Sequence, residues 1–189
     1  TFAGTFTSGQ ANTITINNVQ DVNGNTILAN STSNFTFVLI SIAAQGDIII
    51  SEIMADPDPQ VLLPNVEYVE IFNRSIKNID LKNYTLNTKV LTTTSYILAP
   101  NSYVLLVPAP SVPLFVPFVA QASSIIGVIS FDGLTNTGET ITLRDVDNFN
   151  DINIVTYSDS WYKDATKKDG GYSLELINPN APCSAEANW

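Results

Sequence analysis

The fold of this chain is decided by the stretch Gly46-Asp47-Ile48-Ile49-Ile50-Ser51-Glu52-Ile53-Met54-Ala55-Asp56-Pro57. A second run follows it, Val66-Glu67-Tyr68-Val69-Glu70-Ile71-Phe72-Asn73-Arg74-Ser75. Both runs are rich in β-branched and aromatic residues, which favour strands, and a proline marks the turn between them. Each strand also carries carboxylates among its apolar residues, so the pair could serve either structure or chemistry.

Further strand patterns recur at intervals of about ten residues, separated by turn residues. No window shows a sustained apolar period of about 3.6 residues, so we expect almost no helix. This spacing predicts an all-β fold, a β-sandwich or a barrel. The expected strands are 47–54, 66–72, 79–86, 94–98, 103–107, 125–130, 139–144, 152–157 and 172–177.

The first 45 residues differ from the rest in having little charge and much Asn and Thr. We expect three strands in them, near 13–16, 26–28 and 34–42, too few for a complete sandwich. The break at Ala44 to Gly46 predicts two domains, 1–45 and 46–189. Four prolines between Pro108 and Pro117 cannot pair within a central strand, so this segment is expected to cross between sheets.

The charge of the chain excludes several classes of partner. Its formal net charge is −10, it has no histidine, and no Lys or Arg precedes Arg74. A nucleic-acid surface needs a basic stripe, so we expect neither nucleic acid nor anionic lipid as partner. No apolar run reaches membrane-spanning length, and we expect no insertion into a membrane. The start at Thr1 suggests a fragment of a longer protein.

Five segments of the chain carry distinctive motifs: Ile-Ser-Glu-Ile-Met-Ala-Asp-Pro (50–57), Glu-Tyr-Val-Glu-Ile-Phe-Asn-Arg-Ser (67–75), Ile-Asp-Leu-Lys-Asn-Tyr-Thr-Leu (79–86), Leu-Ala-Pro-Asn-Ser-Tyr-Val-Leu-Leu (98–106) and Asn-Thr-Gly-Glu-Thr-Ile-Thr-Leu-Arg-Asp (136–145). Together these motifs resemble the lamin-tail domain, an immunoglobulin-like sandwich of nuclear lamins and of many bacterial secreted proteins. The ending, with Tyr-Ser-Asp-Ser-Trp-Tyr-Lys-Asp and Gly-Gly-Tyr-Ser-Leu-Glu-Leu-Ile-Asn-Pro, is similar to the bacterial branch. The resemblance implies an immunoglobulin-like β-sandwich over about 47–189.

The segment 1–45 resembles the closing strands of a bacterial Ig-like domain, through the turn Val19-Gln20-Asp21-Val22-Asn23-Gly24-Asn25. A partial domain leaves sheet edges unpaired. Unpaired edges can pair with those of a neighbouring copy, so we expect self-association through these strands.

The residues speak against an enzyme. Without histidine there is no Ser-His-Asp or Cys-His arrangement and no imidazole zinc site. Glu67 and Glu70 are an odd number of residues apart on one strand and therefore point to opposite faces. Glu52 and Glu70 could be neighbours across strands, but we expect structural roles, in turns or in pairs with Arg74, Lys77 or Arg144. Both carboxylates close together in an open cleft would favour the enzyme hypothesis.

No cofactor is expected, and structural calcium is the alternative. Asp21-x-Asn23-x-Asn25 begins like an EF-hand loop but has Thr26 and Thr32 at its sixth and twelfth positions. Asp145-x-Asp147 lacks the continuation as well. Asp56 and Asp58 flank a proline and could hold a hard cation, although an aspartate in a turn more often accepts backbone N–H bonds.

The loop from Trp161 to Gly171 is the first candidate site, because it combines two aromatic residues with three lysines. Aromatic rings with Asp and Lys around them can bind carbohydrate, and Trp and Tyr are also good anchors for a protein partner. The alternative is that Trp161 and Tyr162 close the end of the sandwich. The candidate residues are Trp161, Tyr162, Lys163, Lys167 and Lys168.

The apolar stretch 112–118 is the second candidate. If exposed, Leu114, Phe115 and Phe118 would mark an interface. The alternative is that this loop folds over the open edge of the core.

These observations predict a non-catalytic structural or interaction module of a secreted or cell-surface bacterial protein, one that spaces, anchors or presents neighbouring domains, as in adhesion. The expected partner is a protein or a cell-surface polysaccharide. A carbohydrate-binding module using the Trp161–Lys168 loop is the alternative.

Overall fold

The computed structural model describes residues 6–183 and 185–189. Residues 1–5 of the predicted first segment lie outside them. The chain divides into two compact units, Thr1–Ile40 and Ser41–Trp189. The division falls five residues before the end of the predicted first domain because residues 41–45 belong to the second unit, where Ala43 is buried in the core.

The first unit is a two-stranded antiparallel hairpin in its described part. Strand β1 (Ala11–Ile16) pairs with β2 (Ser31–Thr36) along its whole length, and the rings of Phe35 and Phe37 pack against Phe6. The strand predicted at 26–28 is reduced to a single bridge between Gln20 and Thr26. That this unit is part of an Ig-like domain stays a prediction.

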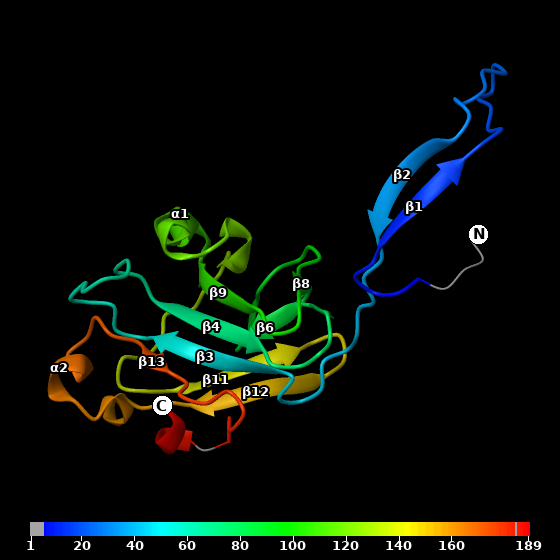
Figure 1. The fold of residues 1–189 in the computed structure, drawn as a ribbon. Coiled ribbons are helices and arrows are strands. Elements are labelled where there is room, and N and C mark those ends of the chain that lie inside the picture. The colour runs from blue at the N-terminus through cyan, green and yellow to red at the C-terminus, as the bar shows by residue number, and fades with distance from the viewer. Residues whose placement is uncertain (1–5, 184) are drawn as a thin grey trace. The chain divides into compact units, whose positions relative to one another are not determined.

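The second unit is a β-sandwich built from two larger sheets, seen in Figure 1 as the layer of β3, β4 and β9 and the layer of β11 and β12. The five-stranded sheet has the order β10-β9-β4-β3-β13 and the four-stranded sheet the order β12-β11-β6-β7. The strands are β3 (Ile48–Met54), β4 (Tyr68–Asn73), β6 (Tyr84–Leu86), β7 (Lys89–Val90), β9 (Tyr103–Pro108), β10 (Ile125–Val128), β11 (Thr140–Asp145), β12 (Asn150–Thr156) and β13 (Leu174–Glu175).

Two further strands, β5 (Ile79–Asp80) and β8 (Ile97–Leu98), form a small sheet of their own. The strand predicted over 79–86 is therefore broken into β5 and β6, because the chain turns at Asn83, whose φ is 63°. The helices are single turns, as the missing helical period predicts. They are η1 (Ala109–Ser111), α1 (Val112–Phe115), η2 (Val116–Phe118), η3 (Ala122–Ser124), η4 (Asp159–Tyr162), α2 (Ala165–Lys168) and η5 (Ala185–Asn188).

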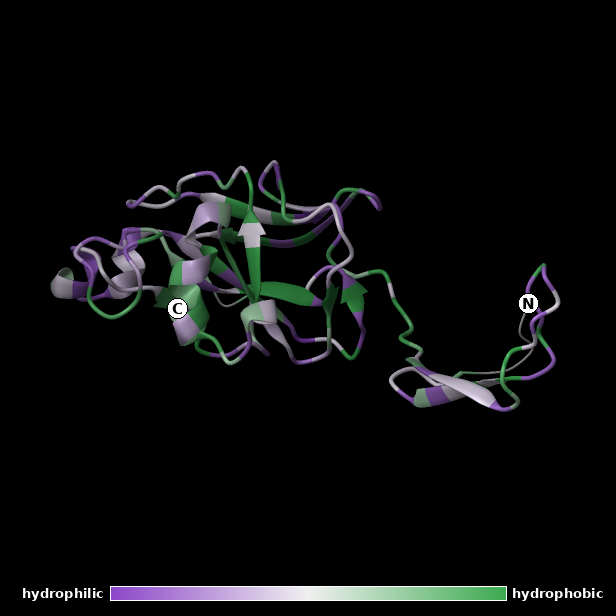
Figure 2. Cartoon of the chain, turned by 90° about the horizontal axis from the view of Figure 1, so that it is seen from above, coloured by the Kyte–Doolittle hydropathy of each residue, from purple (hydrophilic) through white to green (hydrophobic). Residues whose placement is uncertain are grey.

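The core lies between the two sheets and takes alternate residues from their inner faces. Figure 2 shows these strands as the most hydrophobic part of the second unit, with hydrophilic residues gathered in its loops. Tyr84 and Leu86 of β6 are both buried there. The prediction of an all-β, immunoglobulin-like β-sandwich is confirmed.

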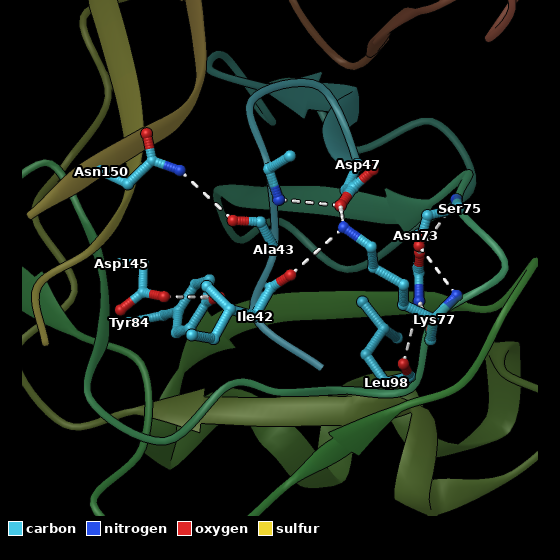
Figure 3. A network of polar contacts seen from close by, with 11 residues as sticks. Ile42, Ala43, Asp47, Asn73, Ser75, Lys77, Tyr84, Leu98, Asp145 and Asn150 are labelled. Atoms are coloured by element: carbon cyan, nitrogen blue, oxygen red, sulfur yellow. Dashed lines mark hydrogen bonds and ion pairs between the residues drawn. The ribbon is translucent and has the colours of Figure 1, made fainter. Parts of the chain in front are cut away.

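A polar network fixes the start of the second unit to its sheets (Figure 3). The Nζ of Lys77 lies 2.6 Å from Asp47 Oδ2 and also donates to the carbonyl of Ile42. The side-chain amide of Asn73, fully buried, donates to the carbonyls of Lys77, Leu98 and Ala99. The bonds of Lys77 therefore hold the entering segment in place. The buried amide of Asn73 is left with no unsatisfied donor.

The proline-rich segment does not cross between sheets, as its composition had led us to expect. It joins β9 to β10, which are parallel neighbours in the same sheet. Parallel neighbours need a crossover connection, and this one carries α1, which Figure 1 shows above the sheet. The crossover packs on the outer face of the sheet, away from the sandwich core, and forms a second apolar cluster with Met54, Tyr68, Val107, Phe115 and Ile125.

Candidate functional site: a groove on the outer face of the sheet

The crossover covers only part of the outer face and leaves a cavity of about 530 Å³ beside it. We call this cavity the outer groove. Its floor comes from β3, β4 and β9, and its wall from the crossover. The lining residues are Glu52, Leu63, Tyr68, Glu70, Asn101, Ser102, Tyr103, Leu105, Phe115, Phe118, Val119, Ala120, Gln121 and Ser124.

A β-bulge places Glu52 in this groove. The pairing of β3 with β4 shifts register between Ile50 and Glu52, so that Ser51 is the additional residue. Before the bulge, Ile48 and Ile50 enter the core, and after it Ile53 does. Strict alternation from Ile48 would have turned Glu52 inward, and the bulge turns it outward instead.

Two more glutamates lie beside Glu52 in register. Glu70 on β4 is its partner on one side, and Glu175 on β13 is its partner on the other. A smaller hollow of about 160 Å³, which we call the acidic pocket, lies among them and shares Glu52, Glu70 and Tyr103 with the outer groove. Its lining is Ser51, Glu52, Glu70, Tyr103, Glu175, Leu176 and Pro179.

The electrostatics of the row favour bound positive charge. Burial raises the pKa of Glu70 to about 7, and the charges of Glu52 and Glu175 act in the same direction, while a hydrogen bond from Ser51 opposes them. Ser51 Oγ donates to Glu70 Oε1 at 2.7 Å, and the hydroxyl of Tyr68 donates to Glu52. Burial, with the charge of Glu52, raises the pKa of Tyr68 as well.

No cation of the described residues neutralises this row. The predicted pairing of Glu52 and Glu70 with Arg74, Lys77 or Arg144 is wrong, because no ion pair of the described residues includes either glutamate, and Lys77 and Arg144 pair with Asp47 and Asp151. Glu67 has a structural role in a loop, because its carboxylate accepts the backbone N–H of Leu134. The ion pairs among the described residues are Lys77–Asp47, Lys89–Asp132, Arg144–Asp151 and Lys168–Asp159.

Tyr103 lines both the outer groove and the acidic pocket, and its ring stacks on Phe72. The rings of Phe72 and Tyr103 stack with their centroids 4.3 Å apart. Phe72 is buried and Tyr103 is 48% exposed, so the stack holds the Tyr103 ring in place at the surface. A fixed, accessible tyrosine ring beside carboxylates can bind a cation or an apolar chain.

The Trp161 loop is arranged differently from a ligand site with open aromatic rings. Trp161 packs against the sandwich core, and its ring centroid lies 5.9 Å from that of Trp189. The Tyr162 hydroxyl donates a hydrogen bond to the carbonyl of Tyr172. Lys167 lies over the ring of Tyr172, and Lys168 pairs with Asp159. Both aromatics thus help to close the end of the sandwich, while binding by this loop stays a prediction.

Lys163, the remaining candidate of that loop, is exposed and adopts a left-handed conformation with φ 54°. Its Nζ donates to the carbonyl of Glu186. All three lysines of the loop therefore have partners within the chain.

The predicted apolar interface is divided by the structure. Phe115 is only 1% exposed and belongs to the apolar cluster under the crossover, so it cannot offer an exposed surface. Leu114 and Phe118 are exposed by 52% and 54%, and Phe118 lines the outer groove. The loop covers the outer face of the sheet, not the open edge of the core.

The aspartates considered for calcium bond within their own turns. Asp21 accepts the backbone N–H groups of Asn23 and Asn25 as well as the Asn25 side chain, whose bond is the largest cause of its lowered pKa. Asp145 accepts the hydroxyl of Tyr84 and the amide of Asn148. Across residues 6–183 and 185–189, no three His, Cys, Asp or Glu side chains are grouped to hold a metal ion. Calcium binding itself remains untested.

The remaining calcium candidates, Asp56 and Asp58, lie against the glycine pair at 170–171. The N–H of Gly171 donates to the Asp56 carbonyl, and a Cβ on Gly170 would lie 1.9 Å from the Asp58 carbonyl. Asp147 accepts a hydrogen bond from the side-chain amide of Asn83.

No helix in the described part of the chain has the length and apolar character to cross a membrane.

Comparison with known proteins agrees with this architecture. No curated protein and no solved structure gives a significant match. A family model described as Lamin Tail Domain matches residues 41–159, which is well over half of the chain and begins where the second unit begins. That family is immunoglobulin-like and non-enzymatic, and the match supports a non-catalytic interaction module. The chain belongs to the lamin tail domain family.

Proposed function

We propose that this chain is an accessory module of a secreted or cell-surface bacterial protein, and that it binds a protein partner through the outer groove. The observation that carries the proposal is the groove itself. It is large enough for several side chains, it is lined by two exposed aromatic rings and by half-buried aliphatic side chains, and it has carboxylates at one end. Such a surface provides apolar anchors together with charges that orient a partner.

The module would space, anchor or present neighbouring domains while the groove holds its partner. The bacterial and extracellular assignment draws its support from the motifs of residues 157–179, which resemble the bacterial branch of the family. A partner that binds these carboxylates must carry positive charge. Nucleic acid is negatively charged, so the carboxylates would repel it. We expect no gel shift of DNA even at low salt.

Carbohydrate binding by the Trp161 loop is the alternative function. It requires aromatic faces open to a sugar ring, whereas Trp161 and Tyr162 are half-buried and bonded within the chain. The groove is therefore the better supported site.

Catalysis by Glu52 and Glu70 is the third possibility, and the structure brings them together in one open cavity. The non-catalytic proposal rests on the family and on the use of both side chains as acceptors for Ser51 and Tyr68. Chromogenic glycosides test it, because hydrolysis by the wild type that disappears in Glu70→Gln would contradict the proposal.

The test of the binding function is a selection of random peptides displayed on phage against the immobilised chain. We expect enriched peptides that bind the wild type and not Phe118→Asp, because a charge at this exposed position disrupts the apolar side of the groove. Phe149→Asp is the matched control, since Phe149 is 87% exposed and does not line the groove. Failure to enrich any peptide, or equal binding to both variants, would overturn the proposal.

A further inference from the structure

We propose that the outer groove and the acidic pocket together receive a lysine side chain of a partner polypeptide, with the ammonium group among Glu52, Glu70 and Glu175 and the apolar neighbours of that lysine in the groove. This inference rests on the proposed protein-binding function and specifies the chemistry of the partner.

The row of three glutamates is complementary in charge to a cation. Glu175, Glu52 and Glu70 lie side by side on β13, β3 and β4, each directly opposite the next. Like charges directly opposite one another destabilise a sheet, and nothing positive in the described residues offsets them here. A cation bound among them removes the repulsion and adds charge-assisted hydrogen bonds.

The acidic pocket has few hydrogen-bond donors of its own. The hydroxyl groups of Ser51 and Tyr68 both donate to carboxylates of the row, so they are already used. The Tyr103 hydroxyl is the other side-chain donor of the acidic pocket, against three carboxylates, so the pocket offers mainly acceptors to an occupant. An ammonium group has three donors and no acceptor, whereas a sugar hydroxyl or a carboxamide brings acceptors for which the pocket supplies few donors.

The size of the acidic pocket and the placement of its carboxylates suit an ammonium group. The acidic pocket measures about 160 Å³, and its carboxylates come from three separate strands. A compact ammonium with rotatable donors suits this arrangement better than the planar fork of a guanidinium. The aliphatic stem of lysine can lie along Leu176 and Pro179, which line the same pocket, and against the ring of Tyr103.

The acidic pocket is continuous with a larger apolar surface. The acidic pocket shares Glu52, Glu70 and Tyr103 with the outer groove. The groove continues with Leu63, Leu105, Phe118 and Val119, which suit apolar residues next to the lysine. A free alkylamine would leave this larger surface unused, so the continuity favours a polypeptide.

The experiment uses an array of capped octapeptides with mixed apolar flanks, in which the central residue is each of the twenty amino acids and also acetyl-lysine. The full chain is applied at pH 8 and low salt. We expect the strongest binding to central lysine, and a loss of at least about tenfold on acetylation, which removes the charge and leaves the stem in place.

Two variants test whether the preference for central lysine on the array depends on the acidic pocket. Glu70→Gln should weaken binding of the lysine peptide by about tenfold. Glu186→Gln changes the net charge equally at an exposed carboxylate outside both hollows and should leave binding unchanged. Circular dichroism of both variants checks that they are folded.

Each other outcome overturns the inference in a recognisable way. Preference for central arginine, or for an uncharged residue, refutes the lysine assignment and leaves the groove as a peptide site. Equal binding of lysine and acetyl-lysine refutes the role of the charge. Binding to none of the peptides, together with a failed phage selection, refutes both the inference and the proposed function.

Discussion

Glu52 and Glu70 lie directly opposite each other on β3 and β4, and the carboxylates of both line the same cavity. A protein selected only for stability would place a cation or an apolar residue at one of these positions. Here the neighbouring hydroxyl groups of Ser51 and Tyr68 satisfy single carboxylate oxygens without neutralising any charge. The pair therefore lowers the stability of the free domain, and this cost is consistent with a binding site.

Glu70 should make the stability of the domain depend on pH near neutrality. Its pKa is raised from 4.5 to about 7, so the folded state binds the proton more tightly than the unfolded state does. The stabilising contribution of that proton is complete below about pH 4.5 and is lost as pH rises through 7. After allowance for partial exposure, we expect a loss of about 2 kcal/mol between pH 5 and pH 8.5.

Urea unfolding of the wild type and of Glu70→Gln at both pH values measures this contribution. Glutamine resembles the protonated side chain, so the variant should match the wild type at pH 5 and exceed its free energy of unfolding at pH 8.5. A constant difference between the two proteins across this range would show that the pKa of Glu70 is not raised.

Gly127 on β10 controls how closely the crossover packs on the sheet. A Cβ at this position would lie 2.8 Å from Val112 Cγ2 and 3.0 Å from the Cα of Ala109. Gly127→Ala should therefore displace the start of the crossover and lower the free energy of unfolding by about 1–3 kcal/mol. Gly133→Ala is the matched control, because its Cβ would meet only the Glu67 carboxylate at 3.5 Å. Equal stability of the two variants in thermal denaturation would contradict this packing.

Trp161→Ala should reduce stability and leave glycan binding unaffected. The half-buried indole packs against the core and against Trp189, so its removal should cost about 1–3 kcal/mol. A glycan array with wild type and variant separates the two functions of this loop. Binding by the wild type that disappears in a still folded variant would restore the carbohydrate hypothesis.

The N-terminal hairpin should promote self-association. Among the described residues, β1 and β2 pair only with each other, and a lone hairpin with free edges is marginally stable in water. Sedimentation velocity of the full chain should show a mass that grows with concentration, and Thr13→Lys, at an exposed β1 position, should reduce it. Thr93→Lys in the second unit is the control. A monomer at every concentration would refute this role of the hairpin.

The sequence predicted the sandwich well because its strands repeat a simple local pattern. Runs of strand-forming residues between turn residues located β3, β4, β9 and β11. The same pattern could not reveal the bulge at Ser51, because the additional residue shows only when β3 is paired with β4.

The candidate site was missed for related reasons. Glu175 joins Glu52 only through the pairing of β13 with β3, which are far apart in the sequence. The prolines after Pro108 signalled an irregular segment, but not that it returns to the same sheet and builds a cavity wall. Conversely, the cluster of Trp, Tyr and Lys around Trp161 looked functional, because a sequence does not show that an aromatic ring is covered.

The most direct test of lysine binding in the outer groove is an NMR titration of the isotope-labelled full chain with a capped Leu-Lys-Phe peptide and its acetyl-lysine counterpart. The account predicts saturable amide shift changes centred on Glu52, Glu70, Tyr103 and Phe118 with the lysine peptide, and much weaker changes with the acetylated one. Changes centred on residues 161–171, or identical weak changes with both peptides, would contradict it.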